Sequence, residues 1–306
     1  MPKHNIRTPD SNDLEELHTI WSTVFDDSDR ALFFNFFYNP KLSVICEFEN
    51  KIAAMGFLIP VGDLIAAQGE NIPCAMIYAV ATLPEFRGFG FGGAVSRELI
   101  NIAHDNSSPA VVLYPANDSL FDFYSKNTSM REWFYGIEYN YLRPFPDFGN
   151  IEYEIISIKE YMFLRENLLN DIPHIKYNHN IVEYQSKLCE LFGGGLYRFK
   201  TPLGDACAVV DQQSDFTIGV KELLIPNELN PVTRQDLILK TVSTIAKKFP
   251  ERKYIVRTPE FHSLNNGREC KCKDAKKRYG MLSLSHDIYL DEKNKTTPPW
   301  YGLAFD

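Results

Sequence analysis

The chain has 306 residues, of which 44% are hydrophobic and 24% charged, a composition typical of globular rather than disordered or fibrous proteins. Its 32 basic and 40 acidic residues give a formal net charge of -8, which argues against nucleic acid as a partner. No apolar run approaches the roughly 20 residues that span a bilayer, and the first residues form no hydrophobic leader. We therefore expect a cytoplasmic protein without a membrane partner.

The six cysteines are scattered, and only Cys270 and Cys272 lie close together in the sequence. Their spacing is not typical of a zinc knuckle or of a redox pair. His174 and His179 likewise have no partner at the spacing of metal ligands. Since cytosolic cysteines are normally reduced, we expect free thiols and no bound metal.

The first half of the chain alternates between strand and helix patterns. Asp10 or Ser11 is expected to cap the first helix, whose apolar residues recur at helical spacing from Leu14 to Val24. The remaining elements follow from hydrophobic periodicity and turn residues. They are a strand at 5–7, a helix near 30–38, strands at 42–48, 52–61 and 76–81, a helix at 92–104, a strand at 110–114, a helix at 119–126 and a hairpin of 132–135 with 138–143.

The proline-bearing stretch 143–147 predicts a boundary between domains 1–147 and 148–306. In the second half, the strand, helix and strand order at 217–257 repeats the order at 76–114, without a short sequence repeat. We predict an α+β fold with mainly antiparallel sheets and flanking helices. The second-half elements are helices at 158–170 and 180–191, a hairpin at 196–210, a strand at 217–225, a helix at 233–249, and strands at 253–257, 281–290 and 300–305.

A glycine cluster joins the strand at 76–81 to the next helix. Gly88, Gly90 and Gly92 occupy alternate positions, and Gly93 follows directly. Without Cβ atoms the backbone can approach an anion closely, and the unsatisfied N–H groups of the first helical turn favour phosphate. We therefore expect this turn to bind a pyrophosphate.

Gly88, Gly90 and Gly93 also fit the G-x-G-x-x-G pattern of dinucleotide-binding folds, with Asp118 as the acid that would bind a ribose. A Rossmann domain usually opens with such a βαβ unit and continues the alternation. Here antiparallel strands precede the unit and a hairpin follows it. The strand order therefore favours a different pyrophosphate-binding fold.

The stretch from Val80 to Gly93 resembles motif A of the GNAT N-acetyltransferase superfamily, in which Gln or Arg precedes x-x-Gly-x-Gly or Ala. Arg87, Gly90 and Gly92 match the motif. The resemblance implies an acetyl-CoA cosubstrate, whose pyrophosphate is held by backbone amides and whose pantetheine pairs with the strand. The cofactor-binding residues implied in this stretch are Val80, Ala81, Thr82, Arg87, Gly88, Phe89, Gly90, Phe91, Gly92 and Gly93.

The segment 116–126 resembles the family segment after the fifth strand, where an Asn precedes a short helix bearing Phe-Tyr-x-Lys. By that match, Asn117 borders the pantetheine arm and Tyr124 lies near the thioester sulfur. The usual Gly-Phe is missing, because Asn127 is followed by Thr-Ser-Met. The connection into the next strand is therefore altered.

Amide formation from a thioester requires a neutral amine, an oxyanion donor and a proton for the thiolate. The Tyr124 hydroxyl, with a reference pKa near ~10, is the candidate general acid. The resemblance implies that a backbone N–H near Ala81 stabilises the carbonyl oxygen. The strand at 76–81 carries no carboxylate or histidine, so Glu70, Asp63 and Tyr78 stay open as the base.

In the second half the corresponding turn, between Ile225 and Thr233, contains no glycine and should not bind coenzyme A. The chain thus looks like a tandem GNAT protein with a degenerate, GNAT-like C-terminal domain. The resemblance implies direct acetyl transfer to a primary amine of a small molecule or peptide. The alternative is a non-catalytic acyl-CoA sensor or interaction module. The sequence leaves open the acceptor and whether the chain forms a homo-oligomer.

Overall fold

The computed structural model describes residues 3–25, 28–66, 69–146, 148–149, 151–260, 273–290 and 298–303. The chain divides into two compact units. The first comprises Met1–Trp133 and Gly280–Leu290, and the second Phe134–Tyr279 and Asp291–Asp306. The division after Trp133 lies before the predicted boundary at 147. It also assigns Gly280–Leu290, a segment late in the sequence, to the first unit.

The first unit is built around a mainly antiparallel sheet with the strand order β1-β2-β3-β4-β5-β13. The pair of β4 and β5 is parallel, as the predicted βαβ unit requires. The last residues of β13, Met281–Leu284, pair antiparallel with β5 and explain why this late segment belongs to the first unit. The elements are β1 (Asn5–Arg7), α1 (Leu14–Val24), α2 (Arg30–Phe37), a 3-10 turn (Pro40–Leu42), β2 (Ser43–Phe48), β3 (Lys51–Ile65), β4 (Asn71–Thr82), a 3-10 turn (Pro84–Phe86), α3 (Phe91–Asp105), β5 (Ala110–Leu113), α4 (Asp118–Asn127), the start of β6 (Arg131–Leu142) and the end of β13 (Lys273–Leu284).

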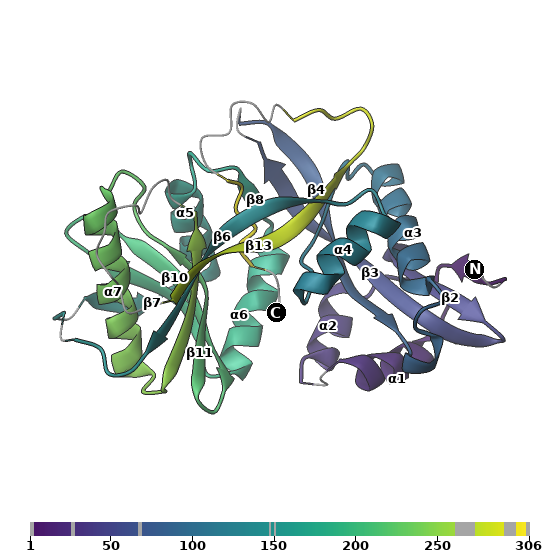
Figure 1. Ribbon diagram of the computed structural model, residues 1–306, viewed down its shortest axis with the longest axis horizontal. Helices are drawn as coiled ribbons and strands as arrows, with labels where there is room; N and C mark the ends of the chain where they lie inside the picture. Colours follow the sequence, from purple (N-terminus) through teal and green to yellow (C-terminus); the bar gives the residue numbers. More distant parts are fainter. Residues whose placement is uncertain are drawn as a thin grey trace. The chain divides into compact units, whose positions relative to one another are not determined.

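Helices cover both faces of this sheet, because successive side chains of a strand point to opposite faces. Phe57 of β3 packs on Trp21 of α1 and Phe33 of α2, with ring centroids 6.2 and 5.0 Å apart. A Cβ built on the neighbouring Gly56 would lie 2.9 Å from the side chain of Val95 in α3. Thus α1 and α2 lie on one face and α3 on the other (Figure 1).

The start of α1 differs from the expectation. The N-cap position is Asp13, and no side chain caps the helix, so the prediction of Asp10 or Ser11 as the cap is wrong. The Asp13 carboxylate instead accepts hydrogen bonds from Arg7 of β1, at 2.6 and 2.9 Å. These bonds lower the pKa of Asp13 and connect the first strand to the first helix.

The second unit contains a sheet with the strand order β6-β12-β11-β10-β9-β7, in which β11 and β12 are parallel. Helix α7 packs on one face of this sheet through its apolar residues, and α5 and α6 contact β9 and β10. The elements that follow β6 are β7 (Glu152–Ile155), α5 (Ile158–Leu168), β8 (His174–Tyr177), α6 (His179–Leu191), β9 (Gly195–Lys200), β10 (Ala206–Ser214), β11 (Thr217–Leu224), α7 (Pro231–Lys248) and β12 (Lys253–Pro259).

A buried charge pair stabilises the second unit. Arg165 of α5 donates through Nε to the carboxylate of Glu222 at 2.9 Å, and both side chains are fully buried. Trp300 Nε1 donates to the same carboxylate at 2.6 Å, and the Tyr161 hydroxyl also donates to it. The segment at 298–303 is thereby attached to α5 and β11 by hydrogen bonds to one carboxylate.

Two predictions about strands are wrong, the hairpin at 132–143 and the strand at 300–305. The hairpin at 132–143 is instead one continuous strand, β6. Gly136 within this strand serves close packing, since a Cβ there would lie 2.4 Å from the Trp300 ring. The strand at 300–305 is reduced, within the described residues, to a single bridge between Trp300 and His174. Strands β7 and β8 were not predicted, and Cys270 and Cys272 lie outside the described residues.

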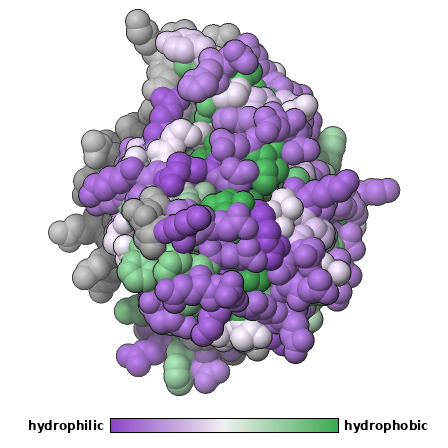
Figure 2. Space-filling model, turned by 90° about the vertical axis from the view of Figure 1, so that its right-hand side faces the viewer, coloured by the Kyte–Doolittle hydropathy of each residue, from purple (hydrophilic) through white to green (hydrophobic). Residues whose placement is uncertain are grey.

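Where the structure is described, helices long and apolar enough to cross a membrane are absent. Figure 2 shows one side of the molecule, on which hydrophobic residues form small patches between hydrophilic ones. Small patches of this kind are ordinary on protein surfaces and require no partner to explain them.

Candidate functional site

The candidate site begins where β4 and β5 separate. Their parallel pairing runs from Cys74 to Met76 on β4, opposite Ala110 to Val112 on β5. Beyond Met76, β4 continues to Thr82 along β3. Over these last residues, no strand within the described residues pairs with the second edge of β4, and an extended molecule can pair there.

A β-bulge turns β4 just before this free edge. Tyr78 pairs with Phe57 and Ala81 with Met55, so two residues of β4 lie opposite Gly56 alone. Ala79 has a φ of 49°, a left-handed conformation that is rare for residues other than glycine. Bulges of this kind re-aim the backbone of a strand and are frequent beside active sites.

The register determines which backbone groups face the free edge. Leu83 N–H donates to the carbonyl of Ala53 on β3 at 3.0 Å. Because backbone groups alternate along an antiparallel strand, Ala81 directs its N–H toward β3, whereas Val80 and Thr82 face away from it. Near Ala81, the N–H groups that face the free edge are therefore those of Val80 and Thr82.

The glycine turn lies between this strand and α3. Gly88 and Gly90 have φ angles of 87° and 84°, which glycine adopts without strain. No side chain caps the start of α3, so its first N–H groups are directed outward as a phosphate would require. A Cβ built on Gly92 would lie 3.2 Å from Thr82 Oγ1, which shows how closely the helix start approaches the free edge. The predicted strand and cradle are thus adjacent.

Arg87 is exposed at this turn. Its Nε donates to the carbonyl of Thr82 at 3.3 Å, which holds the side chain over the end of β4. A guanidinium in this position adds positive charge beside the outward N–H groups of α3. The arrangement fits an anionic group that lies across the turn.

Asn117 is the N-cap of α4. Its Oδ1 accepts from the N–H groups of Ser119 and Leu120 at 3.1 and 3.3 Å. Such a cap stabilises a helix by about 1 kcal/mol. The side-chain oxygen of Asn117 thus has a structural role, and its predicted contact with a pantetheine arm stays a prediction.

Tyr124 lies on α4 and is only 8% exposed. Burial raises the pKa of its hydroxyl to about 12. Its ring packs edge-on against Phe123 at 5.1 Å, and Phe123 in turn lies 3.7 Å from a Cβ built on Gly92. The helix that carries Tyr124 is therefore packed against the glycine turn.

Comparisons with known proteins agree with this geometry. Residues 5–127 match the family model described as the acetyltransferase (GNAT) domain. This part of the chain is a GNAT domain.

Solved structures share the fold over most of the chain. A GCN5-related N-acetyltransferase from Anabaena variabilis is 14% identical, with a TM-score of 0.66 over 92% of this chain and 73% of that one. One from Kribbella flavida is 15% identical, with a TM-score of 0.64 over 92% and 71%. The N-myristoyltransferase of Saccharomyces cerevisiae is 9% identical, with a TM-score of 0.51 over 84% and 73%. No curated protein matches the sequence. The activity typical of a GNAT acetyltransferase domain is acyl transfer from an acyl-CoA.

Two of the base candidates of the GNAT domain, Asp63 and Glu70, lie near the start of β4, at the end opposite Ala81. Asp63 pairs with Pro73, and Glu70 immediately precedes the strand. At about 3.3 Å per residue, the strand places them roughly 20 Å or more from Ala81, too far for direct proton transfer at the free edge. Tyr78 is close, but its ring packs 5.2 Å from Phe33 among the aromatic residues of α1 and α2.

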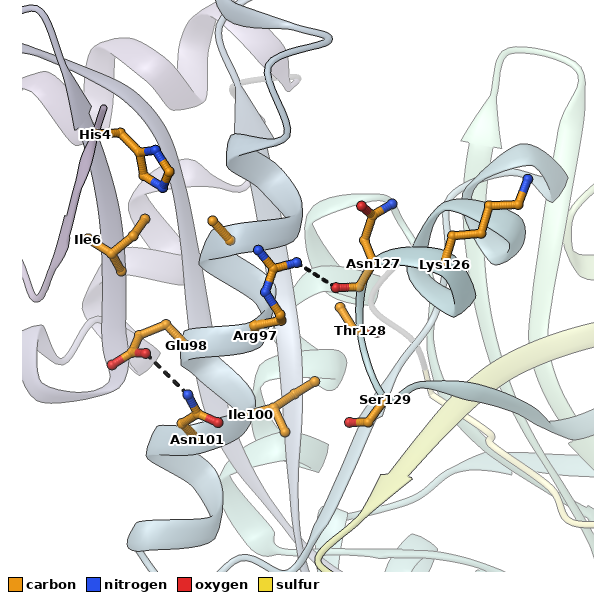
Figure 3. A pocket seen from close by; sticks show the side chains of 11 residues that line it. His4, Ile6, Arg97, Glu98, Ile100, Asn101, Lys126, Asn127, Thr128 and Ser129 are labelled. Carbon is orange, nitrogen blue, oxygen red and sulfur yellow. Dashed lines mark hydrogen bonds between the residues drawn. The ribbon is translucent and has the colours of Figure 1, made fainter. Parts of the chain in front are cut away.

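A hollow of about 640 Å³ lies along the outer side of α3 in the GNAT domain. Its lining comes from the start of the chain, from α3 and from the end of α4 (Figure 3). Arg97 donates to the backbone oxygen of Asn127 at 2.7 Å, and Asn101 donates to Glu98 at 3.3 Å. None of the predicted cofactor residues is among the described residues that line it. We place the site at the free edge of β4, because the chemistry requires the cradle and the strand together.

The second unit contains a parallel strand pair joined by a helix whose start differs from that of α3. A register shift at Val209/Val210 leaves Lys221 as a bulge on β11, which pairs in parallel with β12. Helix α7 begins at Pro231, where a proline lacks the N–H, and its N-cap Asn230 accepts from Thr233 N–H at 3.0 Å. The expected helix start at Thr233 is thus wrong by two residues. The capped start of α7 offers fewer N–H donors to a phosphate than the uncapped start of α3 does.

Proposed function

We propose that the GNAT domain transfers an acetyl group from acetyl-CoA directly to a primary amine of a small molecule or peptide. One observation carries the proposal: the free edge of β4 ends beside the uncapped, glycine-rich start of α3. The amides of pantetheine can pair with Val80 and Thr82 as an added strand does. The pyrophosphate then reaches the N–H groups of α3.

A structural neighbour supports an acyl-CoA donor. The yeast N-myristoyltransferase was solved with bound myristoyl-CoA, and its fold matches 84% of this chain. Since the identity is 9%, the likeness concerns the fold, and the donor site rests on the residues of this chain. The acetyl group, rather than a longer acyl group, follows from the family match and is part of the proposal.

The reaction at the free edge requires attack by the amine, stabilisation of the oxyanion and departure of the thiol. The amine nitrogen attacks the thioester carbonyl while a C–N bond forms. An N–H of Val80 or Thr82 stabilises the oxyanion that develops. The C–S bond then breaks, and the nitrogen loses its proton, so that amide and free thiol are the products.

Tyr124 is assigned to the departing sulfur. Its pKa of about 12 lies roughly 3.5 units above that of a free thiol, so full proton transfer to the thiolate would be uphill by about 5 kcal/mol. The hydroxyl therefore acts as a hydrogen-bond donor to the sulfur. The proton that completes the thiol comes from the amine nitrogen, which becomes positively charged once it has attacked. Burial thus refines the role of general acid that the sequence suggested.

Calorimetry with acetyl-CoA tests the donor, and thiol release tests catalysis. We expect acetyl-CoA to bind and thiol release to depend on an added amine from a panel of amines, peptides and aminoglycosides. Tyr124→Phe should retain binding and lose most of the turnover. Absence of binding at millimolar acetyl-CoA would reject the donor, and full turnover by Tyr124→Phe would reject its role at the sulfur.

A second candidate is a non-catalytic acyl-CoA sensor or interaction module. The observation in its favour is the distance of Asp63 and Glu70 from the free edge, which leaves the amine without an identified base. The two candidates differ in one result. Tight binding of acetyl-CoA without amine-dependent thiol release across the panel would establish the non-catalytic function.

We further infer that the second unit is a degenerate repeat of the GNAT domain without a cofactor site. The parallel pair β11 and β12, the connecting helix α7 and the bulge at Lys221 support the repeat. Pro231 and the Asn230 cap support the loss of the phosphate cradle. Calorimetric titration should then give one acetyl-CoA per chain. A stoichiometry of two would contradict this inference.

A further inference from the structure

An exposed aromatic ring lies inside the glycine turn. Phe89 stands between Gly88 and Gly90, and its side chain is 44% exposed. Exposing so large an apolar side chain to water is unfavourable. A polar side chain at this turn would avoid that cost. The position therefore favours a role in contact with a ligand over a role in the core.

Phe89 is held in place from one side. Its ring lies 6.1 Å from that of Phe48 and 5.8 Å from that of Phe91, which is itself buried. Phe48 packs in turn on Phe86 at 5.8 Å, and His4 on Phe91 at 5.3 Å. The ring thus rests on an aromatic cluster. Its remaining surface faces outward beside the phosphate cradle.

Coenzyme A carries a planar group, its adenine base, close enough to the pyrophosphate to reach the ring of Phe89. Only a ribose separates its pyrophosphate from its adenine base. When the pyrophosphate binds to the first N–H groups of α3, the base must therefore lie within one sugar of the turn. Aromatic side chains stack on purine bases, and a ring already fixed by its neighbours loses little conformational entropy on stacking.

The hollow along α3 is a less suitable binding site for the adenine base than the ring of Phe89. It begins at His4, one ring away from Phe89, but Arg97 and Glu98 there are engaged with the protein itself (Figure 3). The exposed ring of Phe89, by contrast, lies within the turn that contacts the pyrophosphate. The observations therefore favour the ring.

We propose that Phe89 is a stacking platform for the adenine base and makes the enzyme prefer acyl-CoA over donors that carry only phosphopantetheine. This proposal rests on the proposed function, since it requires the pyrophosphate at α3. It assigns donor specificity to one side chain. The acetyl group and the pantetheine arm do not contact Phe89 and are not affected by it.

The test compares acetyl-CoA with acetyl-4′-phosphopantetheine, which lacks the 3′-phosphoadenosine and keeps only one phosphate of the pyrophosphate. Dissociation constants are measured by calorimetry for the wild type, Phe89→Leu, Phe89→Ala and Phe89→Trp. We expect Phe89→Ala and Phe89→Leu to weaken acetyl-CoA binding by about 5- to 150-fold, the range of base stacking on an aromatic ring. Phe89→Trp should retain binding, and the affinity for acetyl-4′-phosphopantetheine should stay the same in every variant.

Phe163→Ala is the matched control, because Phe163 is an exposed phenylalanine of α5 in the second unit. It should leave both affinities unchanged. An equal loss for both donors in Phe89→Ala would show that the turn itself is disturbed and would overturn the proposal. So would unchanged acetyl-CoA binding in Phe89→Ala and Phe89→Leu. If the wild type binds neither donor, the proposed function fails together with this inference.

Discussion

Gly92 and Thr82 approach so closely that a Cβ on Gly92 would lie 3.2 Å from Thr82 Oγ1. This contact joins the first turn of α3 to the free edge of β4, the two parts of the proposed donor site. A larger side chain at position 92 would fill the space between them. The close approach leaves little room for a larger side chain at this position.

Gly92→Val should lower the affinity for acetyl-CoA by more than about 10-fold, since the branched side chain would obstruct the cradle. The helix itself should tolerate the change, because valine has a higher helix propensity than glycine. Calorimetry and thermal unfolding separate the two effects. Gly195→Ala, where an added Cβ would lie 3.8 Å from the nearest side chain, serves as the control. Equal affinity in Gly92→Val and the wild type would contradict the assigned site.

Tyr124→Phe should reduce amine-dependent thiol release by about 10- to 100-fold, the effect of losing one hydrogen bond to a charged atom. Because the pKa of Tyr124 is raised to about 12, its hydroxyl stays protonated at neutral and mildly alkaline pH. The ratio of wild-type to variant rates should therefore be constant from about pH 7 to 10. A ratio that declines within that range would indicate a lower pKa than burial gives.

The raised pKa of Tyr124 also has a consequence for stability. Its neutral form is favoured in the folded state, so this contribution is fully present below the unfolded pKa near ~10 and is lost as pH rises toward 12. Tyrosinate absorbance measured during an alkaline titration checks the sign. Tyr124→Phe should remove one titrating group from the alkaline end of the curve.

Arg165→Met should destabilise the second unit by about 3–5 kcal/mol, because it leaves the buried carboxylate of Glu222 without its charge partner. Arg165→Met combined with Glu222→Gln should recover part of this loss, since the uncompensated charge is then absent. Urea unfolding measures the free energy of unfolding of the single and the double variant. Lys200→Met, which removes an exposed ion pair with Glu152, should cost less than about 1 kcal/mol. Equal losses from Lys200→Met and Arg165→Met would contradict the argument from burial.

The four described cysteines should resist alkylation in the native protein. Cys46, Cys74, Cys189 and Cys207 are free and buried. Burial raises the pKa of each thiol, to about 11 for Cys46 and about 12 for Cys189, so the reactive thiolate is scarce near neutral pH. Iodoacetamide labelling followed by peptide mass spectrometry should modify these residues only after unfolding. Rapid native labelling of Cys189 would show that α6 opens.

The glycine turn and the start of α3 were predictable because their signals are local. Glycine spacing from Gly88 to Gly93 specifies a turn and a helix start within a few residues, and both occur where expected. The role of Gly136 was not predictable, because the same residue type marks a turn or a close approach. The rings of Trp300 and Tyr279, both distant in the sequence, determine which of the two applies.

By itself, the sequence determined the order of strands and helices around the glycine turn, the parallel unit and the family resemblance. These depend on periodicity and on neighbouring residues. The tertiary structure alone decided the free edge of β4, the burial that raises the pKa of Tyr124, the return of Met281–Leu284 to β5 and the pairing of Arg165 with Glu222. Each of these joins residues far apart in the chain, and their association is governed by packing and desolvation that no local pattern encodes.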